Sequence, residues 1–183
     1  MTPRETATMR PGGAFDAFRL AGRGQEIAGN VDAATLSRVA DRLAPGPAPI
    51  RWRIVGQVDA SGRPALELRL DGEVPLECQR CLRPFVWPVA QSTLLLLARD
   101  ERELARLDAE DEHEVIAAST PLATLGLVED ELLLTLPFAP HCGRADCATG
   151  DAGRASGAGE AVAPSPFGAL AALKGSPADK PKG

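Results

Sequence analysis

Tyrosine is absent from this 183-residue sequence, and aromatic residues make up only 4% of it. A core must therefore be built from leucine, valine, alanine and isoleucine, which the hydrophobic content of 44% allows. No apolar run approaches the roughly 18–20 residues that a membrane-spanning helix needs. Residues 1–13 also lack the apolar centre of a signal peptide. We therefore expect a cytoplasmic protein with no membrane association.

Positive charge is scarce as well, because 20 lysines and arginines stand against 25 acidic residues. The resulting net charge of −5 gives no support to nucleic-acid binding by bulk electrostatic attraction. The sequence has neither a phosphate-binding GxxxxGK[ST] loop nor a GxGxxG turn, and its two histidines leave little room for a catalytic triad. We predict a protein that is not an enzyme and has no small-molecule substrate.

Four cysteines are the most informative residues present, and they form two pairs. Cys78 and Cys81 make a CxxC pattern within a strand-like segment, and Cys142 and Cys147 follow much later in the chain. Four thiolates can complete a tetrahedral zinc site, and paired cysteines in the cytoplasm bind metal more often than they form structural disulfides. We predict Zn²⁺ bound by all four.

The wider spacing of the second cysteine pair leaves alternatives open. His141 is able to replace one thiolate, or the two pairs carry no metal. A redox dithiol enzyme is a further alternative, but a thioredoxin-like CxxC opens a helix that lowers the thiol pKa. Here Pro84 and Pro88 follow within a strand-like segment, which disfavours redox catalysis.

The hydrophobic pattern predicts a single α+β domain over residues 14–142, mainly antiparallel β-sheet or a partial barrel with a few helices. Apolar and polar residues alternate over 51–58 and 66–71, and a third run over 73–77 leads into the CxxC. Because returning strands begin at Phe85, we expect the CxxC at the tip of a hairpin.

Four other segments carry weaker signals. We predict a short strand over 15–20, a helix over about 33–43 capped by Asp32, and a helix over about 124–135, with a strand over 132–136 as the alternative for its end. Residues 100–114 are strongly acidic and predict a solvated loop or an exposed helix.

The remainder of the chain is expected to lie outside the domain. Residues 1–13 predict a flexible leader, 143–164 a flexible Gly/Ala/Ser linker, and 175–183 a disordered end. Between them, 165–174 predicts a short amphipathic helix that docks on a partner or on its own domain. Its apolar face consists of Phe167, Leu170 and Leu173.

A local basic patch is the one feature of the residues themselves that favours RNA contact. Between positions 51 and 99 there are seven arginines and five acidic residues. Arginine binds phosphate in a bidentate manner, and tryptophan offers a stacking surface. The alternative is that these are ordinary exposed side chains of a sheet. The candidates for RNA or partner contact are Arg51, Arg53, Arg80, Arg83 and Trp87.

Three separated segments resemble one known family. They are VPLECQRCL at 74–82, VEDELLLTLP at 128–137, and SPFGALAALK at 165–174, where the family's terminal motif has asparagine in place of Ser165. The order and spacing also agree, including an acidic insert between the first two. The chain therefore resembles the bacterial YceD family, the large ribosomal RNA subunit accumulation proteins, over about residues 15–174.

The resemblance implies a non-enzymatic, cytoplasmic factor needed for the synthesis or accumulation of large-subunit (23S) ribosomal RNA. Its implied partners are the ribosomal RNA precursor or proteins of large-subunit assembly. No catalytic residues carry over from the family. A zinc-containing protein-interaction module that does not act on RNA is the alternative function.

Overall fold

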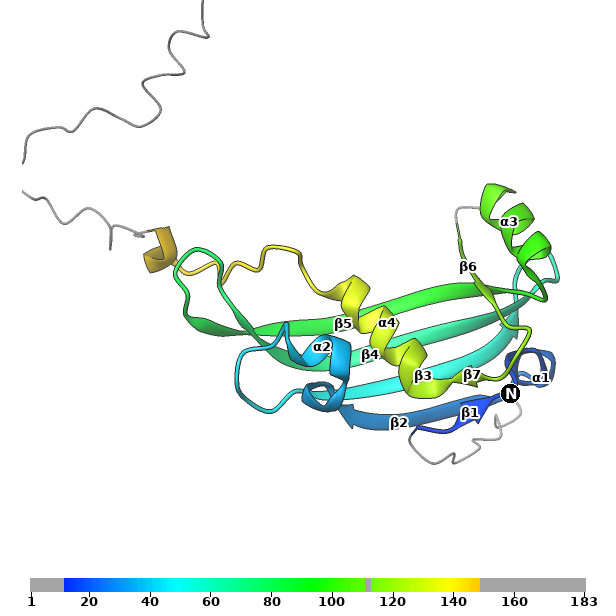
Figure 1. Ribbon diagram of the computed structural model, residues 1–183, viewed down its shortest axis with the longest axis horizontal. Coiled ribbons are helices and arrows are strands. Elements are labelled where there is room, and N and C mark those ends of the chain that lie inside the picture. Colours follow the sequence, from blue (N-terminus) through cyan, green and yellow to red (C-terminus); the bar gives the residue numbers. More distant parts are fainter. Residues whose placement is uncertain (1–11, 111–112, 149–183) are drawn as a thin grey trace, which may run out of the picture. The chain divides into compact units, whose positions relative to one another are not determined.

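The computed structural model describes residues 12–110 and 113–148, and its centre is a five-stranded sheet (Figure 1). The strand order is β2-β3-β4-β5-β6, and neighbours are antiparallel except for β6, which runs parallel to β5. The sheet is open and does not close into a barrel. Its strands are β2 Glu26–Asp32, β3 Pro49–Val58, β4 Pro64–Glu77, β5 Pro84–Ala98 and β6 Glu114–Ala117.

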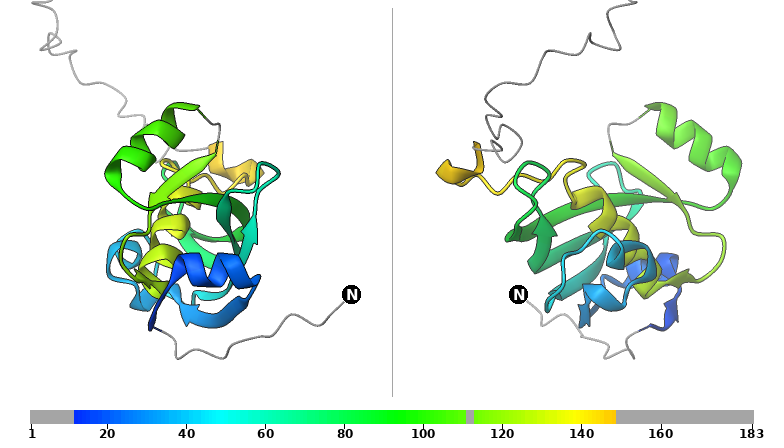
Figure 2. Two further views of the ribbon diagram at one scale, coloured as in Figure 1. Left: turned by 90° about the vertical axis from the view of Figure 1, so that its right-hand side faces the viewer. Right: turned by 60° about the vertical axis from the view of Figure 1, so that its left-hand side comes forward.

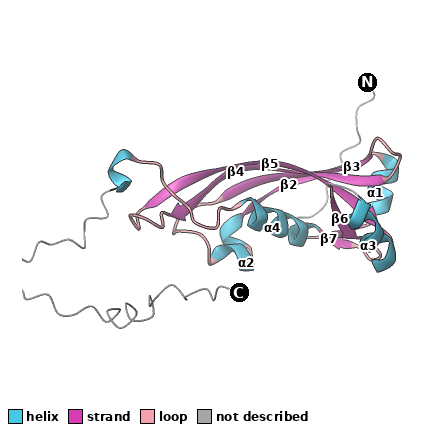
Figure 3. Ribbon diagram, turned by 90° about the horizontal axis from the view of Figure 1, so that it is seen from above, coloured by secondary structure: helices cyan, strands magenta, loops and turns pink. Residues whose placement is uncertain are grey.

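Four α-helices of the described segments accompany the sheet, and Figures 2 and 3 place two of them, α2 and α4, against one of its faces. The helices are α1 Ala17–Arg23, α2 Ser37–Ala40, α3 Glu101–Glu110 and α4 Thr124–Thr135. The short elements are the turns η1 Ala33–Thr35 and η2 Ala145–Ala148 and the two-stranded sheet of β1 Ala14–Phe15 and β7 Leu122–Ala123. This arrangement is the α+β fold predicted from the sequence. None of these helices is long and apolar enough to cross a membrane.

The two faces of the sheet differ sharply in chemistry. On β3, Ile50, Trp52 and Ile54 are buried, whereas Arg51 and Arg53 between them are exposed. The difference follows from the strand period of two, which sends successive side chains to opposite faces. The leucines of β4 continue the buried layer, and α4 contributes to the same hydrophobic cluster. The arginines therefore lie on the face opposite to the core.

Polar contacts hold α4 in place. The backbone N–H of Arg38 donates to Oε1 of Glu129 at 2.7 Å, and this bond, together with the guanidinium, lowers the pKa of Glu129. Closer to the sheet, the hydroxyl of Thr93 donates to Glu131, whose pKa is raised by burial. Because Thr93 belongs to β5, these bonds fix α4, and thus the segment that follows it, against the sheet.

The strands β4 and β5 form one long hairpin instead of the several shorter strands expected. They pair without interruption from Ala65–Leu96 to Glu77–Pro84. β6 pairs with β5 at residues 95–98, which, within the part of the chain that the structure describes, leaves 84–94 of β5 at the edge of the sheet. The prediction that the CxxC lies at a hairpin tip is confirmed.

The predicted strand over 15–20 is wrong, because α1 begins at Ala17. Oδ1 of Asp16 accepts a hydrogen bond from the backbone N–H of Arg19 at 2.9 Å, and the helix ends at Gly24 with φ 58°. The apolar residues of this segment satisfy both a period of two and helical spacing. The two capping residues decide in favour of the helix.

Of the other two predicted helices, one is broken into shorter elements and one is confirmed. The helix over 33–43 breaks into η1 and the short α2, although Asp32 does cap η1 by accepting from the backbone N–H of Ala34 at 3.0 Å. The helix over 124–135 is confirmed by α4, and the acidic segment 100–114 contains the exposed helix α3. The compact unit continues through Ala148, past the expected domain end at 142.

Candidate metal centre

The tip of the β4–β5 hairpin is a tight turn that carries the first cysteine pair. The backbone N–H of Leu82 donates to the carbonyl oxygen of Cys78 at 2.8 Å, and that of Cys78 donates to Arg83 at 3.0 Å. With φ 56°, Leu82 is the one non-glycine residue of the described segments in the left-handed region. The turn therefore forces an L side chain into a conformation that is rarely favourable.

The second cysteine pair reaches this tip from the segment that follows α4. The backbone N–H of Gln79 donates to the carbonyl oxygen of Pro140 at 2.9 Å. Nη2 of Arg83 donates to Oδ2 of Asp146 at 2.7 Å. The hairpin and the segment after α4 are thus joined on both sides of Cys142, which brings the two cysteine pairs together.

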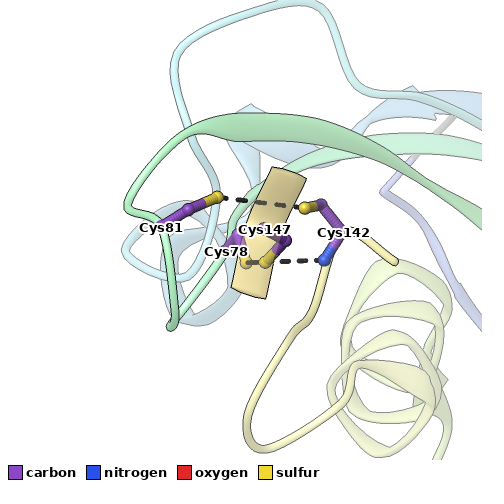
Figure 4. A group of neighbouring side chains, drawn as sticks. All are labelled: Cys78, Cys81, Cys142 and Cys147. Atoms are coloured by element: carbon purple, nitrogen blue, oxygen red, sulfur yellow. Dashed lines mark hydrogen bonds between the residues drawn. The ribbon is translucent and has the colours of Figure 1, made fainter. Parts of the chain in front are cut away.

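The four sulfur atoms converge on one centre (Figure 4). The Sγ atoms of Cys78 and Cys147 are 3.5 Å apart, and those of Cys81 and Cys142 are 3.9 Å apart. All four ligand atoms lie within 4.8 Å of one another, and no disulfide joins them. Each close contact therefore links the hairpin tip to the segment after α4.

The local backbone favours a thiolate at the centre of this group. Burial alone would raise the pKa of Cys78, but backbone N–H groups of Cys81, Cys142 and Arg80 point at its sulfur and lower the pKa to about 5. In contrast, the neighbouring sulfurs of Cys142 and Cys78 raise the pKa of Cys147 to about 12. Crowded thiols of this kind lose their protons together when a cation neutralises their charge.

The geometry suits a soft metal ion. A tetrahedral zinc site with Zn–S bonds of about 2.3 Å has sulfur–sulfur distances of about 3.8 Å. The two close contacts, at 3.5 and 3.9 Å, bracket that distance. The four thiols can therefore hold a metal ion. His141 is exposed and does not belong to the group found among the described residues, which consists of cysteines alone. After Cys81 the chain enters β5, so no helix follows the CxxC.

Leu82→Gly is expected to stabilise the protein. Glycine adopts the left-handed conformation freely, whereas an L residue there costs about 1–2 kcal/mol, partly offset by the greater entropy of glycine in the unfolded chain. Because Leu82 is 67% exposed, little burial is lost. We expect a gain of up to about 1 kcal/mol in the free energy of unfolding, measured by chemical denaturation.

Leu134→Gly is the matched control, since Leu134 is 72% exposed but lies within α4. There glycine lowers stability by up to about 1 kcal/mol. A loss of stability in both variants would contradict the role assigned to the turn at Leu82.

The structure separates the predicted contact residues. Arg51 and Arg53 lie together on the open face of the sheet. Trp87 faces the other way, because it pairs with the buried Val74 and packs edge-on against Phe85 with the ring centroids 6.4 Å apart. It therefore offers no stacking surface beside the arginines.

The other two predicted contact residues lie beside the four-cysteine group. Arg80 and Arg83 belong to the hairpin tip, and Arg83 pairs with Asp146. The predicted leader lies almost wholly outside the described residues. So do most of the linker and all of the predicted helix with its apolar face of Phe167, Leu170 and Leu173.

Comparison with known families identifies the chain. The fold and the site define a class of small α+β proteins. Its mark is a four-cysteine centre between the tip of a hairpin and a later segment of the chain. The chain belongs to the family described as Large ribosomal RNA subunit accumulation protein YceD, whose model matches residues 66–174. The match includes both cysteine pairs and the terminal motif, and it confirms the resemblance seen in the sequence. Comparison with solved structures finds no match.

Proposed function

We propose that this chain is a non-enzymatic, cytoplasmic accessory factor for the accumulation of 23S ribosomal RNA and for large-subunit assembly. The observation that carries the proposal is the family match, which spans more than half of the chain. Its partners are the ribosomal RNA precursor or the proteins that assemble with it. The family match favours this function over a zinc-containing interaction module unrelated to RNA.

The metal centre supports a role in binding or assembly. The four cysteines would hold Zn²⁺ as a structural ion, with no coordination position left for a substrate. When bound, zinc supplies a cross-link between the hairpin tip and the segment after α4. Such a cross-link fixes the shape of a surface without taking part in a reaction.

The proposed function is tested in cells that lack the chain. The ratio of mature 23S to 16S ribosomal RNA is expected to fall, together with the amount of free large subunits in sucrose gradients. Expression of the wild-type chain should restore both. An unchanged ratio and an unchanged gradient profile, at growth rates where ribosome synthesis is limiting, would overturn the proposal.

A further inference from the structure

Three arginines lie in one shallow depression on the open face of the sheet. The depression has a volume of about 690 Å³. Arg51, Arg53 and Arg69, here called the arginine face, line it together with Asn30 and a single acidic residue, Asp71. Each of the three arginines is paired with a carboxylate, Arg51 with Asp71, Arg53 with Glu26 and Arg69 with Glu67, so what the face offers an anion is guanidinium N–H donors. Figure 3 shows α2 and α4 on the other face of the sheet.

Two of these arginines occupy an unfavourable pairing. Arg53 on β3 and Arg69 on β4 are direct cross-strand partners, and like charges in such positions repel. A carboxylate partly offsets the positive charge of each arginine. Arg53 pairs with Glu26 at 3.2 Å, and Arg69 pairs with Glu67 at 2.6 Å. An anion that bridged the two guanidinium groups would turn the repulsion into attraction.

The ion pairs leave donor capacity free. A guanidinium group carries five N–H donors. The contact of Arg53 with Glu26 uses Nη1, and the contact of Arg51 with Asp71 uses Nη2. Arg51, Arg53 and Arg69 have side chains that are 76%, 53% and 57% exposed, so their remaining donors face solvent. Opposite Arg53 on β2 stands Ala28, whose small side chain leaves the approach open.

We propose that the arginine face binds the phosphate groups of an RNA strand laid across β2, β3 and β4; the identification of the polyanion as RNA rests on the proposed function. Arginine forms bidentate bonds with phosphate oxygens, and Arg51 and Arg53 are spaced about 6.8 Å apart along the strand. Trp52 also lines the depression but is only 2% exposed, and Trp87 lies on the opposite face, so no tryptophan ring is open to stack on bases here. Binding is therefore independent of base sequence and sensitive to salt.

The test uses the full chain and a fluorescein-labelled, unstructured 20-nucleotide RNA, with binding followed by fluorescence anisotropy over a series of salt concentrations. The double variant Arg53→Gln/Arg69→Gln is compared with Arg102→Gln/Arg106→Gln on α3, which removes the same charge from another exposed surface. On single-stranded RNA, the patch variant is expected to lower the slope of log K against log salt by about 0.7 for each arginine removed. Thermal unfolding should change little, because the loss of the ion pairs to Glu26 and Glu67 is offset by the removal of the repulsion between Arg53 and Arg69, and glutamine keeps an N–H donor for each carboxylate.

Three outcomes overturn the arginine-face proposal. The first is an equal loss of RNA affinity in both double variants, which would mean that RNA responds to the overall charge of the protein and not to the arginine face. The second is no RNA binding by the wild-type chain at low salt. The third is a patch variant that loses 23S accumulation in cells while RNA affinity in vitro is unchanged, which would place a protein partner on this face. In none of these cases does the proposed function itself fail, because it is judged by 23S levels in cells that lack the chain.

Discussion

Cys78→Ser is expected to abolish zinc binding and to destabilise the hairpin tip. The wild-type chain, purified without chelator, should contain about one zinc ion, and the variant almost none. Apparent binding free energies of structural zinc sites are about 10–16 kcal/mol, so the loss of one ligand should remove several kcal/mol of stabilisation from the tip. Elemental mass spectrometry and hydrogen exchange of residues 78–83 and 137–148 measure the two effects.

The damage from Cys78→Ser should remain local. Cys78 and Cys147 are buried, but neither belongs to the main hydrophobic cluster that the sheet forms with α4. Far-UV circular dichroism should therefore keep most of its strand signal. His141→Ala is the control, because this exposed side chain lies beside Cys142 and outside the thiol group, and zinc content should be retained. Substoichiometric amounts of every metal in the wild-type chain would refute the zinc proposal.

Gly56→Ala is expected to cause the second large effect, a loss of folding stability. A Cβ atom at position 56 would lie 2.1 Å from the carbonyl oxygen of Leu20 and 2.3 Å from its carbonyl carbon. These are backbone atoms of α1, so no side-chain rotation relieves the clash, and α1 must move away from β3. Overpacking of this kind costs about 1–3 kcal/mol and occasionally more, and we expect the upper end.

Gly22→Ala provides the contrast within the same helix. Gly22 is exposed in α1, and a Cβ atom there would meet nothing within 4 Å. Since alanine is the better helix former, this variant should gain up to about 1 kcal/mol. Urea denaturation of both variants gives the comparison. If Gly56→Ala unfolded at the same urea concentration as the wild-type chain, the close approach of α1 to β3 would be disproved.

The sequence predicts elements well where one periodicity dominates. The strict alternation around Trp52 and the leucines of β4 fixes both the strands and their buried face. The helix over 124–135 is confirmed to its ends. At residues 15–20 the apolar residues fit both periods, and the hydrogen bond from the backbone N–H of Arg19 to Asp16 decides the outcome. Local capping therefore outweighs a short apolar pattern.

The candidate site is predictable in part for a similar reason. Cysteine is rare in this chain, so its four positions suggest one centre even before their meeting is visible. Their convergence depends on contacts such as the hydrogen bond from the backbone N–H of Gln79 to the carbonyl oxygen of Pro140. No pattern in the sequence predicts this bond. The arginine face depends on register, because only the pairing of β3 with β4 places Arg69 opposite Arg53. Composition alone does not distinguish that pair from Arg80 and Arg83 at the hairpin tip.

The length of β5 also affects the behaviour of the protein at high concentration. Residues 84–94 form a sheet edge, and an unpaired edge is a template on which strands of other molecules can aggregate. Pro84 and Pro88 lie on this edge, and proline has no N–H with which to extend a ladder. The two prolines that argue against a redox helix after the CxxC therefore also protect the protein from intermolecular β-pairing.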